Sequence, residues 1–104
     1  MSIQVISNLI NQEVSNYDSA FTTHDVIEVL IKKYKKDWNN YVMQYRKESR
    51  NIRVQEQIAV REIGRYLSRN TKTLHIKNNG KLKSNEIKGL IEHKPRITTQ
   101  WMKN

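Results

Sequence analysis

Hydrophobic residues recur at helical spacing in three stretches of the chain, and this pattern predicts three main helices. The first stretch covers residues 3–14, where one helical face carries Ile3, Ile6, Leu9, Ile10 and Val14. Ser2 precedes it as a candidate N-cap, because a serine hydroxyl can accept a hydrogen bond from an amide of the first turn. The polar residues 15–19 then predict a loop.

The second stretch fits two interpretations. Thr22 or Thr23 can cap its start, and Asp25 falls in the first turn, where the helix dipole favours an acid. From there one helical phase is kept by Ile27, Leu30, Ile31, Tyr34, Trp38, Tyr41, Val42 and Tyr45. This phase fits one continuous helix over about residues 23–48, roughly 39 Å long, and equally a break near Asp37. A continuous helix with such a face would also offer a seam for a homodimer.

A third helix is predicted over residues 55–69, after a polar connection over residues 46–53. Its apolar face consists of Ala59, Val60, Ile63, Tyr66 and Leu67. The opposite face is polar and basic, and it carries Gln57, Arg61, Arg65 and Ser68, flanked by Arg69. The sequence therefore predicts a helix with one side in the core and the other in solvent.

Beyond Asn70 the spacing changes from helical to alternating, which predicts a hairpin over residues 72–83. Its first strand covers residues 72–77 and its returning strand residues 81–83. Between them, Asn78-Asn79-Gly80 predicts a tight turn, because Asn-Gly accepts positive φ.

The remaining residues predict one more helix and one more strand. Ser84 resembles an N-cap, and a short helix is expected over residues 85–91. The β-prone residues 96–102 predict a last strand, which Trp101 anchors to the core.

These elements together predict a single domain over residues 1–104. Three glycines and one proline leave no segment that resembles a linker. The fold class we expect is mainly α with a small C-terminal β-hairpin, made of three to four helices and two or three short strands.

The order of the elements resembles the winged helix-turn-helix superfamily. FTTHDVIEVL (residues 21–30) is similar to a second helix entered from a capped turn, and VREIGRYLSRN (residues 60–70) is similar to a recognition helix. The resemblance implies a small transcription regulator, in which helix 55–69 enters the major groove of duplex DNA and hairpin 72–83 acts as the wing. The chain departs from the family's pattern in two places: roughly residues 36–53 separate the second and third helices, and a helical segment is expected between the strands.

Charge is distributed unevenly along the chain, whose formal net charge is +9. Residues 1–31 contain four acids and neither lysine nor arginine, so they carry −4, whereas residues 32–104 carry +13. This asymmetry is expected if one side of the fold faces a polyanion, and the alternative is a solvated surface that only keeps the protein soluble. A further basic cluster consists of Lys32, Lys33, Lys35 and Lys36. It can contact the backbone of a polyanion or form a solvated helix face.

The basic face of helix 55–69 has the chemistry of base recognition. Arg61, Arg65 and Ser68 recur at helical spacing and point the same way. An arginine in the major groove can hold guanine O6 and N7, and Gln57 can pair with adenine. Ser68 suits a base or a phosphate. The alternative is an ordinary solvated face on which Glu62 pairs with Arg65 or Arg69.

The predicted hairpin supplies a second set of candidate contacts, namely Lys77, Asn79, Lys81 and Lys83. Three ammonium groups around a tight turn can reach phosphates or a minor groove. The alternative is an exposed hairpin whose lysines prevent pairing with other strands.

No pattern in the sequence predicts catalysis, a metal or a cofactor. The chain has no cysteine, and His24, His75 and His93 lack the spacing of metal ligands. No glycine-rich phosphate loop and no context of an activated nucleophile is found. No run approaches the ~18 apolar residues of a membrane span, and the N-terminus lacks a basic leader region, so we expect a cytoplasmic protein.

Two other functions stay open at this point. A winged-helix-like domain can act as an adaptor that binds an acidic protein, because fold alone does not determine function. Binding of RNA or single-stranded DNA would instead need Trp38, Tyr41 and Tyr45 exposed as a stacking platform. Their helical spacing favours the core.

Overall fold

Helices make up most of this structure, a computed structural model that describes residues 2–83, 87, 89–90 and 97–104. Three strands form a small antiparallel sheet in the order β1-β3-β2. In chain order the elements are the 3-10 turn η1 (Ser2–Val5), α1 (Ser7–Ser15), β1 (Phe21–Thr22), α2 (Thr23–Lys33), α3 (Lys35–Met43), the 3-10 turn η2 (Gln44–Lys47), α4 (Ile52–Arg69), α5 (Thr71–Leu74), β2 (Ile76–Lys83) and β3 (Ile97–Lys103). The expectation of a mainly α fold with a small sheet is confirmed.

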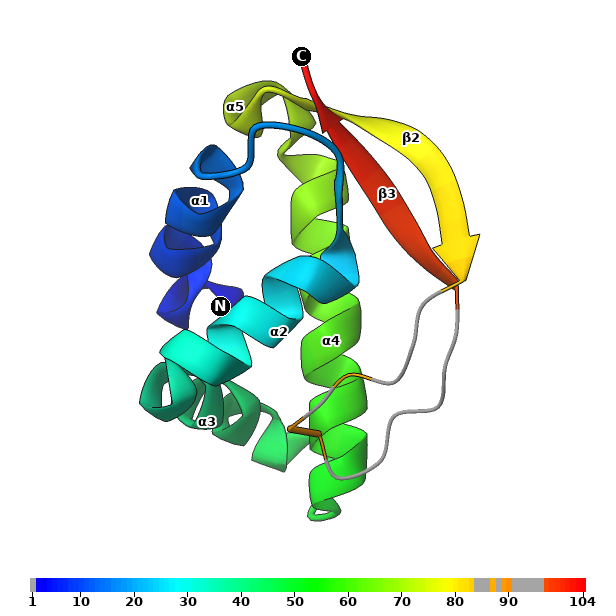
Figure 1. Cartoon of the computed structure of the whole chain (residues 1–104). Coiled ribbons are helices and arrows are strands. Elements are labelled where there is room, and N and C mark those ends of the chain that lie inside the picture. The colour runs from blue at the N-terminus through cyan, green and yellow to red at the C-terminus, as the bar shows by residue number, and fades with distance from the viewer. Residues whose placement is uncertain (1, 84–86, 88, 91–96) are drawn as a thin grey trace.

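The longest helix, α4, runs along the length of the molecule (Figure 1). In that view α1 and α3 lie on one side of α4, β2 and β3 lie on the other, and α2 crosses between them, in contact with α1, α3, α4 and β3. The side chains buried between these elements form one cluster that includes Ile10, Ile27, Trp38, Ile63 and Trp101. A single core therefore joins the helices to the sheet.

The start of the chain is helical in two steps. Ser2 opens the 3-10 turn η1 instead of capping an α-helix, and α1 follows Ile6, which makes no capping side-chain hydrogen bond. Ile10 and Val14 are buried as the spacing predicted. The predicted loop is confirmed at residues 16–19, and Ser15 is still the last residue of α1.

The start of α2 is stabilised by the predicted cap. The hydroxyl of Thr22 accepts a hydrogen bond from the amide of Asp25 at 3.1 Å, and the carboxylate of Asp25 accepts one from the amide of Thr22 at 2.9 Å. This reciprocal capping box satisfies two amides that the helix itself leaves without partners.

The helix predicted over residues 23–48 is not continuous. It ends at Lys33 and restarts at Lys35, because Tyr34 between them has φ −127° and ψ 49°, outside the helical region. The break lies three residues before the predicted one at Asp37, which instead falls in the first turn of α3. The apolar face of this segment is not available as a dimer seam, because Ile27, Leu30 and Trp38 are buried within this chain's own core.

α4 begins at Ile52, three residues earlier than predicted, and ends at Arg69 as predicted. The side-chain oxygen of Asn51 accepts a hydrogen bond from the amide of Arg53 at 2.9 Å and caps the helix. Its buried face consists of Gln55, Glu56, Ala59, Ile63 and Leu67. The predicted polar connection over residues 46–53 is therefore shorter, with η2 at one end and the first turn of α4 at the other.

The hairpin predicted over residues 72–83 is wrong. Thr71–Leu74 form a short helix, His75 has φ 55°, and Ile76–Lys83 form one strand, β2, which pairs with β3. Asn78-Asn79-Gly80 makes a β-bulge inside this strand instead of a turn between two strands. The side chain of Asn78 accepts a hydrogen bond from the amide of Gly80 at 2.8 Å, and Gly80 has φ 94°. The positive φ is thus used within the bulge.

The connection between β2 and β3 is described only in part. The predicted cap at Ser84 and most of the predicted helix over residues 85–91 lie outside the described residues. Ile87 is buried, and Gly89 lies against Ile31 of α2, so the connection returns to the core at these positions.

The predicted last strand is confirmed as β3, and Trp101 anchors it. The indole nitrogen of Trp101 donates to the hydroxyl of Thr23 at 3.0 Å, and Trp101 faces Phe21 of β1 across the sheet. The hydroxyl of Thr98 accepts a hydrogen bond from the amide of His24 at 3.4 Å. These contacts hold β3 against the start of α2.

Candidate nucleic-acid interface

The exposed face of α4 carries the predicted polar stripe. Gln57, Arg61, Arg65 and Ser68 are exposed, and on a helix of 3.6 residues per turn they lie opposite the buried side chains Ala59 and Ile63. Arg69 is also exposed and lies beside the stripe. The structure therefore brings the predicted base-reading residues together on one solvent-facing surface.

A buried tyrosine holds the middle of α4 in place. The hydroxyl of Tyr41 on α3 donates a hydrogen bond to the backbone carbonyl of Ala59 at 2.7 Å, and Tyr45 donates to the hydroxyl of Tyr41 at 3.4 Å. Burial raises the pKa of Tyr41, and the hydrogen bond with Tyr45 and the charge of Glu62 add to this effect. Tyr41 is therefore a neutral donor at ordinary pH.

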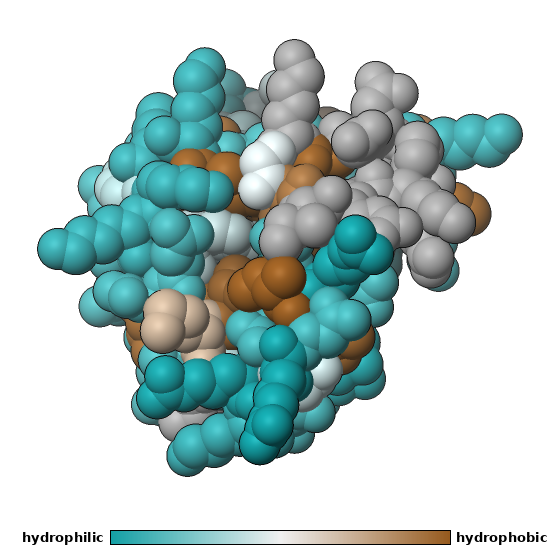
Figure 2. Space-filling view, turned by 90° about the horizontal axis from the view of Figure 1, so that it is seen from below, coloured by the Kyte–Doolittle hydropathy of each residue, from teal (hydrophilic) through white to brown (hydrophobic). Residues whose placement is uncertain are grey.

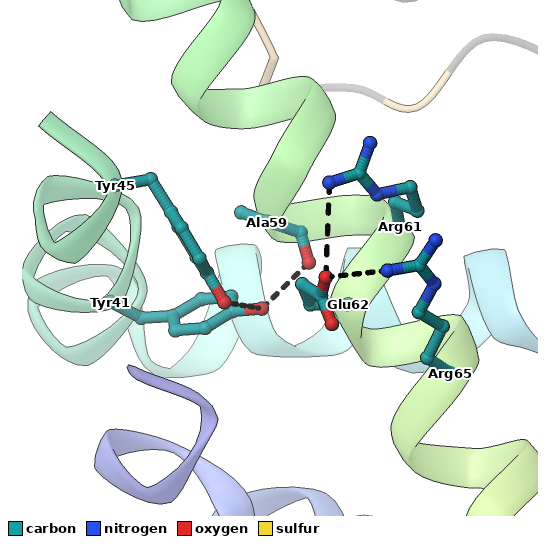
Figure 3. A network of polar contacts seen from close by, with 6 residues as sticks. All are labelled: Tyr41, Tyr45, Ala59, Arg61, Glu62 and Arg65. Carbon is teal, nitrogen blue, oxygen red and sulfur yellow. Dashed lines mark hydrogen bonds and ion pairs between the residues drawn. The ribbon is translucent and has the colours of Figure 1, made fainter. Parts of the chain in front are cut away.

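Glu62 is bound by both arginines of the stripe (Figure 3). Its Oε1 accepts a hydrogen bond from Arg65 Nη1 at 3.1 Å and lies 3.8 Å from Arg61 Nη2. The side chains of Arg61 and Arg65 are still 56% and 52% exposed. The alternative of an intrahelical pair with Arg65 is thus confirmed, but a guanidinium has five N–H donors and one such contact leaves most of them available.

The candidate residues of β2 are exposed along a strand, not gathered around a turn. Lys77 and Lys83 are six positions apart, roughly 20 Å at ~3.3 Å per residue. Residues paired across a sheet point to the same face, so the pairs Lys81–Thr99 and Lys83–Ile97 share one face with Asn78–Trp101. Lys77, paired with Met102, points to the other face. The bulge therefore separates the lysines onto two sides of β2.

Asn79 is engaged within the sheet. Its side-chain amide donates a hydrogen bond to the side chain of Gln100 on β3 at 2.9 Å. One N–H donor of the Asn79 side chain is therefore already engaged within the protein. Gln100 was missed by the sequence reasoning, because no local pattern connects it to a residue 21 positions away.

The aromatic residues considered for single-strand stacking are in the core. Trp38, Tyr41 and Tyr45 are 1%, 0% and 7% exposed, and they pack edge to face with centroid distances of 5.6 and 5.4 Å. Side chains buried in this way cannot stack on bases. The interpretation of this set as core is confirmed, and its use as a stacking platform is excluded.

The other sequence candidates have different surroundings. Lys32, Lys33, Lys35 and Lys36 are all exposed on both sides of the break at Tyr34. His24 is buried at the start of α2 and His75 is exposed, whereas His93 lies outside the described residues. Among the described residues, no three His, Asp or Glu side chains are grouped to hold a metal ion.

The end of the molecule formed by α3 and the start of α4 is mostly hydrophilic, with a smaller hydrophobic area near its middle (Figure 2). Met43 and Ile52, which are 47% and 42% exposed, belong to these elements. Within the described part of the chain, no helix is both long and apolar enough to cross a membrane.

Comparison of the chain with protein-family models, with curated proteins and with solved structures finds no match. Any inference about function therefore depends on the geometry and charge of the exposed surfaces of α4 and β2.

Proposed function

We propose that this protein binds duplex DNA in a sequence-dependent way, as a small transcription regulator. In this proposal the exposed face of α4 enters the major groove and reads bases with Arg61 and Arg65, assisted by Gln57 and Ser68. Arg69 and the lysines of β2 hold phosphates. The observation that carries the proposal is the exposed stripe on α4, whose opposite face buries Ala59, Ile63 and Leu67 in the core. A major groove admits one α-helix of this kind.

The topology supports a winged-helix arrangement with a corrected wing. A short strand lies between α1 and α2, the long helix α4 with one exposed face comes before α5 and β2, and β3 returns between β1 and β2 in the sheet. In this arrangement β2 and β3 serve as the strands of the wing, in place of the hairpin expected over residues 72–83. Lys81 and Lys83, which share one face of β2, would then approach the backbone beside the groove that α4 occupies.

The charges favour DNA over an acidic protein as the partner. The candidate residues combine a helix face for base edges with Lys81 and Lys83, which share one face of β2 and are suited to phosphates. An acidic protein would need carboxylates at matching positions to pair with the same residues. Binding to an acidic protein and binding to RNA or single strands are the outcomes that the experiment must separate from duplex binding.

The test is a fluorescence-anisotropy titration of labelled duplex DNA over a series of salt concentrations. If about 4–6 phosphates are contacted, log K falls against log salt with a slope near −4 to −5. Single-stranded DNA and RNA of the same sequence serve as competitors. A flat salt dependence, or displacement of the duplex by the single strands, contradicts the proposal.

Two variants separate base reading from phosphate contact. Arg65→Ala should weaken binding to a preferred duplex, recovered from a random library, by about 1–3 kcal/mol and binding to scrambled duplex much less. Lys81→Ala should weaken both by a similar factor of a few-fold. Lys47→Ala, which removes the same charge from η2, serves as the matched control. Equal losses for Arg65→Ala and Lys81→Ala on both duplexes contradict the assignment of base reading to α4.

A further inference from the structure

Glu62 is the one acid in the exposed half of α4 around the arginine stripe, and a single oxygen of its carboxylate contacts both guanidinium groups. Figure 3 shows the side chains of Arg61 and Arg65 on the same side of α4, with one oxygen of the Glu62 carboxylate joined to both guanidinium groups. The two arginines carry a formal charge of +2, and Glu62 brings the net charge of the three side chains to +1. The contacts also restrict the rotation of two long side chains before any ligand arrives.

The position of Glu62 is itself restricted. Its side chain is only 26% exposed, about half the exposure of either arginine. It lies close enough to the buried Tyr41 hydroxyl to contribute to the electrostatic environment of that group. Tyr41 is in turn bonded to the backbone of α4 at Ala59. The carboxylate therefore lies closer to the core than the two guanidinium groups do.

A fixed carboxylate at this place affects two kinds of contact differently. A phosphate that approaches the arginines meets a negative charge behind them, which costs binding energy on every DNA sequence. A guanine edge is neutral, and it is read through the N–H donors that point away from Glu62. The carboxylate thus disfavours sequence-independent contact more than it disfavours base contact.

We propose that Glu62 is a specificity-determining residue, which positions Arg61 and Arg65 for base reading and weakens their binding to phosphates on non-preferred sequences. This inference rests on the proposed binding of duplex DNA. In this inference α4 carries a group that repels phosphate, Glu62, beside two groups that attract it, Arg61 and Arg65. Proteins commonly discriminate between partners by combining repulsive and attractive contacts.

The test compares Glu62→Gln, Glu62→Asp and wild type on the preferred duplex and on a scrambled duplex over a salt series. Glu62→Gln keeps the shape of the side chain and removes its charge. It should bind scrambled duplex on the order of threefold to tenfold more tightly at low salt. The ratio of the two affinities should fall by a similar factor, and the salt slope should steepen by up to about 1.

Two control variants separate this effect from a gain of net charge and from a change of shape. Glu28→Gln adds the same charge on the exposed surface of α2, and its affinity ratio should equal that of wild type. Glu62→Asp keeps the charge, so its affinity for scrambled duplex should stay within about twofold of wild type. If Glu62→Asp gains as much as Glu62→Gln, or if Glu28→Gln lowers the ratio equally, the inference is wrong.

The two levels of the argument fail in different ways. Absence of duplex binding by wild type contradicts the proposed function and the inference with it. Discriminating binding by wild type that Glu62→Gln leaves unchanged contradicts the inference alone. Thermal unfolding of each variant is measured alongside, so that a change in the affinity ratio at unchanged stability assigns the effect to the interface.

Discussion

The two halves of the proposed interface are built on very different supports. The stripe on α4 stands on an 18-residue helix whose opposite face is buried, whose start is capped by Asn51 and whose middle is bonded to Tyr41. β2 is an edge strand of eight residues, and Ile76 is its only buried side chain. In the described sheet, β2 pairs with β3 along one edge, and its other edge pairs with no strand.

The contrast corresponds to two kinds of contact. A bidentate contact between arginine and guanine requires a planar group held in a fixed position, and a helix backed by a core provides it. A lysine is a flexible point charge that can follow a phosphate, so the strand beneath it needs less rigidity. In the proposed interface, the arginines of the stripe thus stand on a helix backed by the core, and the lysines stand on an exposed edge strand.

The largest effect should come from removing the support of α4. Ile63→Ala deletes a fully buried side chain under the stripe and should lower the free energy of unfolding by about 2–5 kcal/mol. Leu82→Ala on β2, where the side chain is 45% exposed, should cost less than about 1 kcal/mol. Urea unfolding followed by far-ultraviolet circular dichroism measures both. Similar costs for the two variants would show that the supports do not differ.

Glycine substitutions should act in opposite directions in the two regions. Gly64→Ala in α4 places a Cβ 3.9 Å from Thr23 Cγ2, an ordinary contact, and should stabilise the protein by roughly 0.5–1 kcal/mol through helix propensity. Gly80→Ala in β2 meets no atom within 4 Å, but φ 94° is strained for alanine and should cost about 1–2 kcal/mol. Midpoints of thermal unfolding report the signs, and two shifts of the same sign contradict the prediction.

A smaller effect is expected from the hydroxyl that connects α3 to α4. Tyr41→Phe removes one buried hydrogen bond and should cost about 0.5–1.5 kcal/mol at pH 7. The raised pKa of Tyr41 adds a dependence on pH. Unfolded tyrosine ionises near pH 10, so the contribution of Tyr41 is fully present below pH ~10 and is lost as pH rises toward its folded-state pKa.

Unfolding by urea between pH 8 and 11 tests this sign. Wild type should lose stability above pH ~10, and Tyr41→Phe should lose less over the same interval because it has no proton to release there. An identical pH dependence in the two proteins would assign the alkaline loss to other groups, among them Tyr17, whose pKa is also raised by its burial and by the nearby Glu13.

Local signals were sufficient for the helical half of the fold. The Thr22 and Asp25 side chains cap α2 as their spacing indicated. Of the predicted apolar positions of α4, Ala59, Ile63 and Leu67 are buried, and Val60 and Tyr66 are half-buried. The exposed stripe follows directly from the same spacing. Each of these features depends on residues within one or two helical turns of each other. The hydrophobic and polar pattern of a sequence predicts structure at this short range.

Features that depend on distant residues were not predictable. The sequence Asn78-Asn79-Gly80 is compatible with a turn and with a bulge. It forms a bulge because β2 pairs with β3, which lies some 20 residues later in the chain. The break at Tyr34 was misplaced for a related reason. The amide of Tyr34 still donates to Leu30 and its carbonyl still accepts from Trp38, so the apolar phase continues across a bend that the φ and ψ angles of one residue produce.

Thr22 is at once the last residue of β1 and the N-cap of α2, so the chain has no spacer between its sheet and its helical layer. A displacement of the sheet must therefore carry the first turn of α2 with it, and α2 packs on α4. The distance between the arginine surface and the lysine strand is consequently a built-in dimension of the molecule. In the proposed complex, the groove that receives α4 and the phosphates that contact β2 must therefore lie at a matching separation.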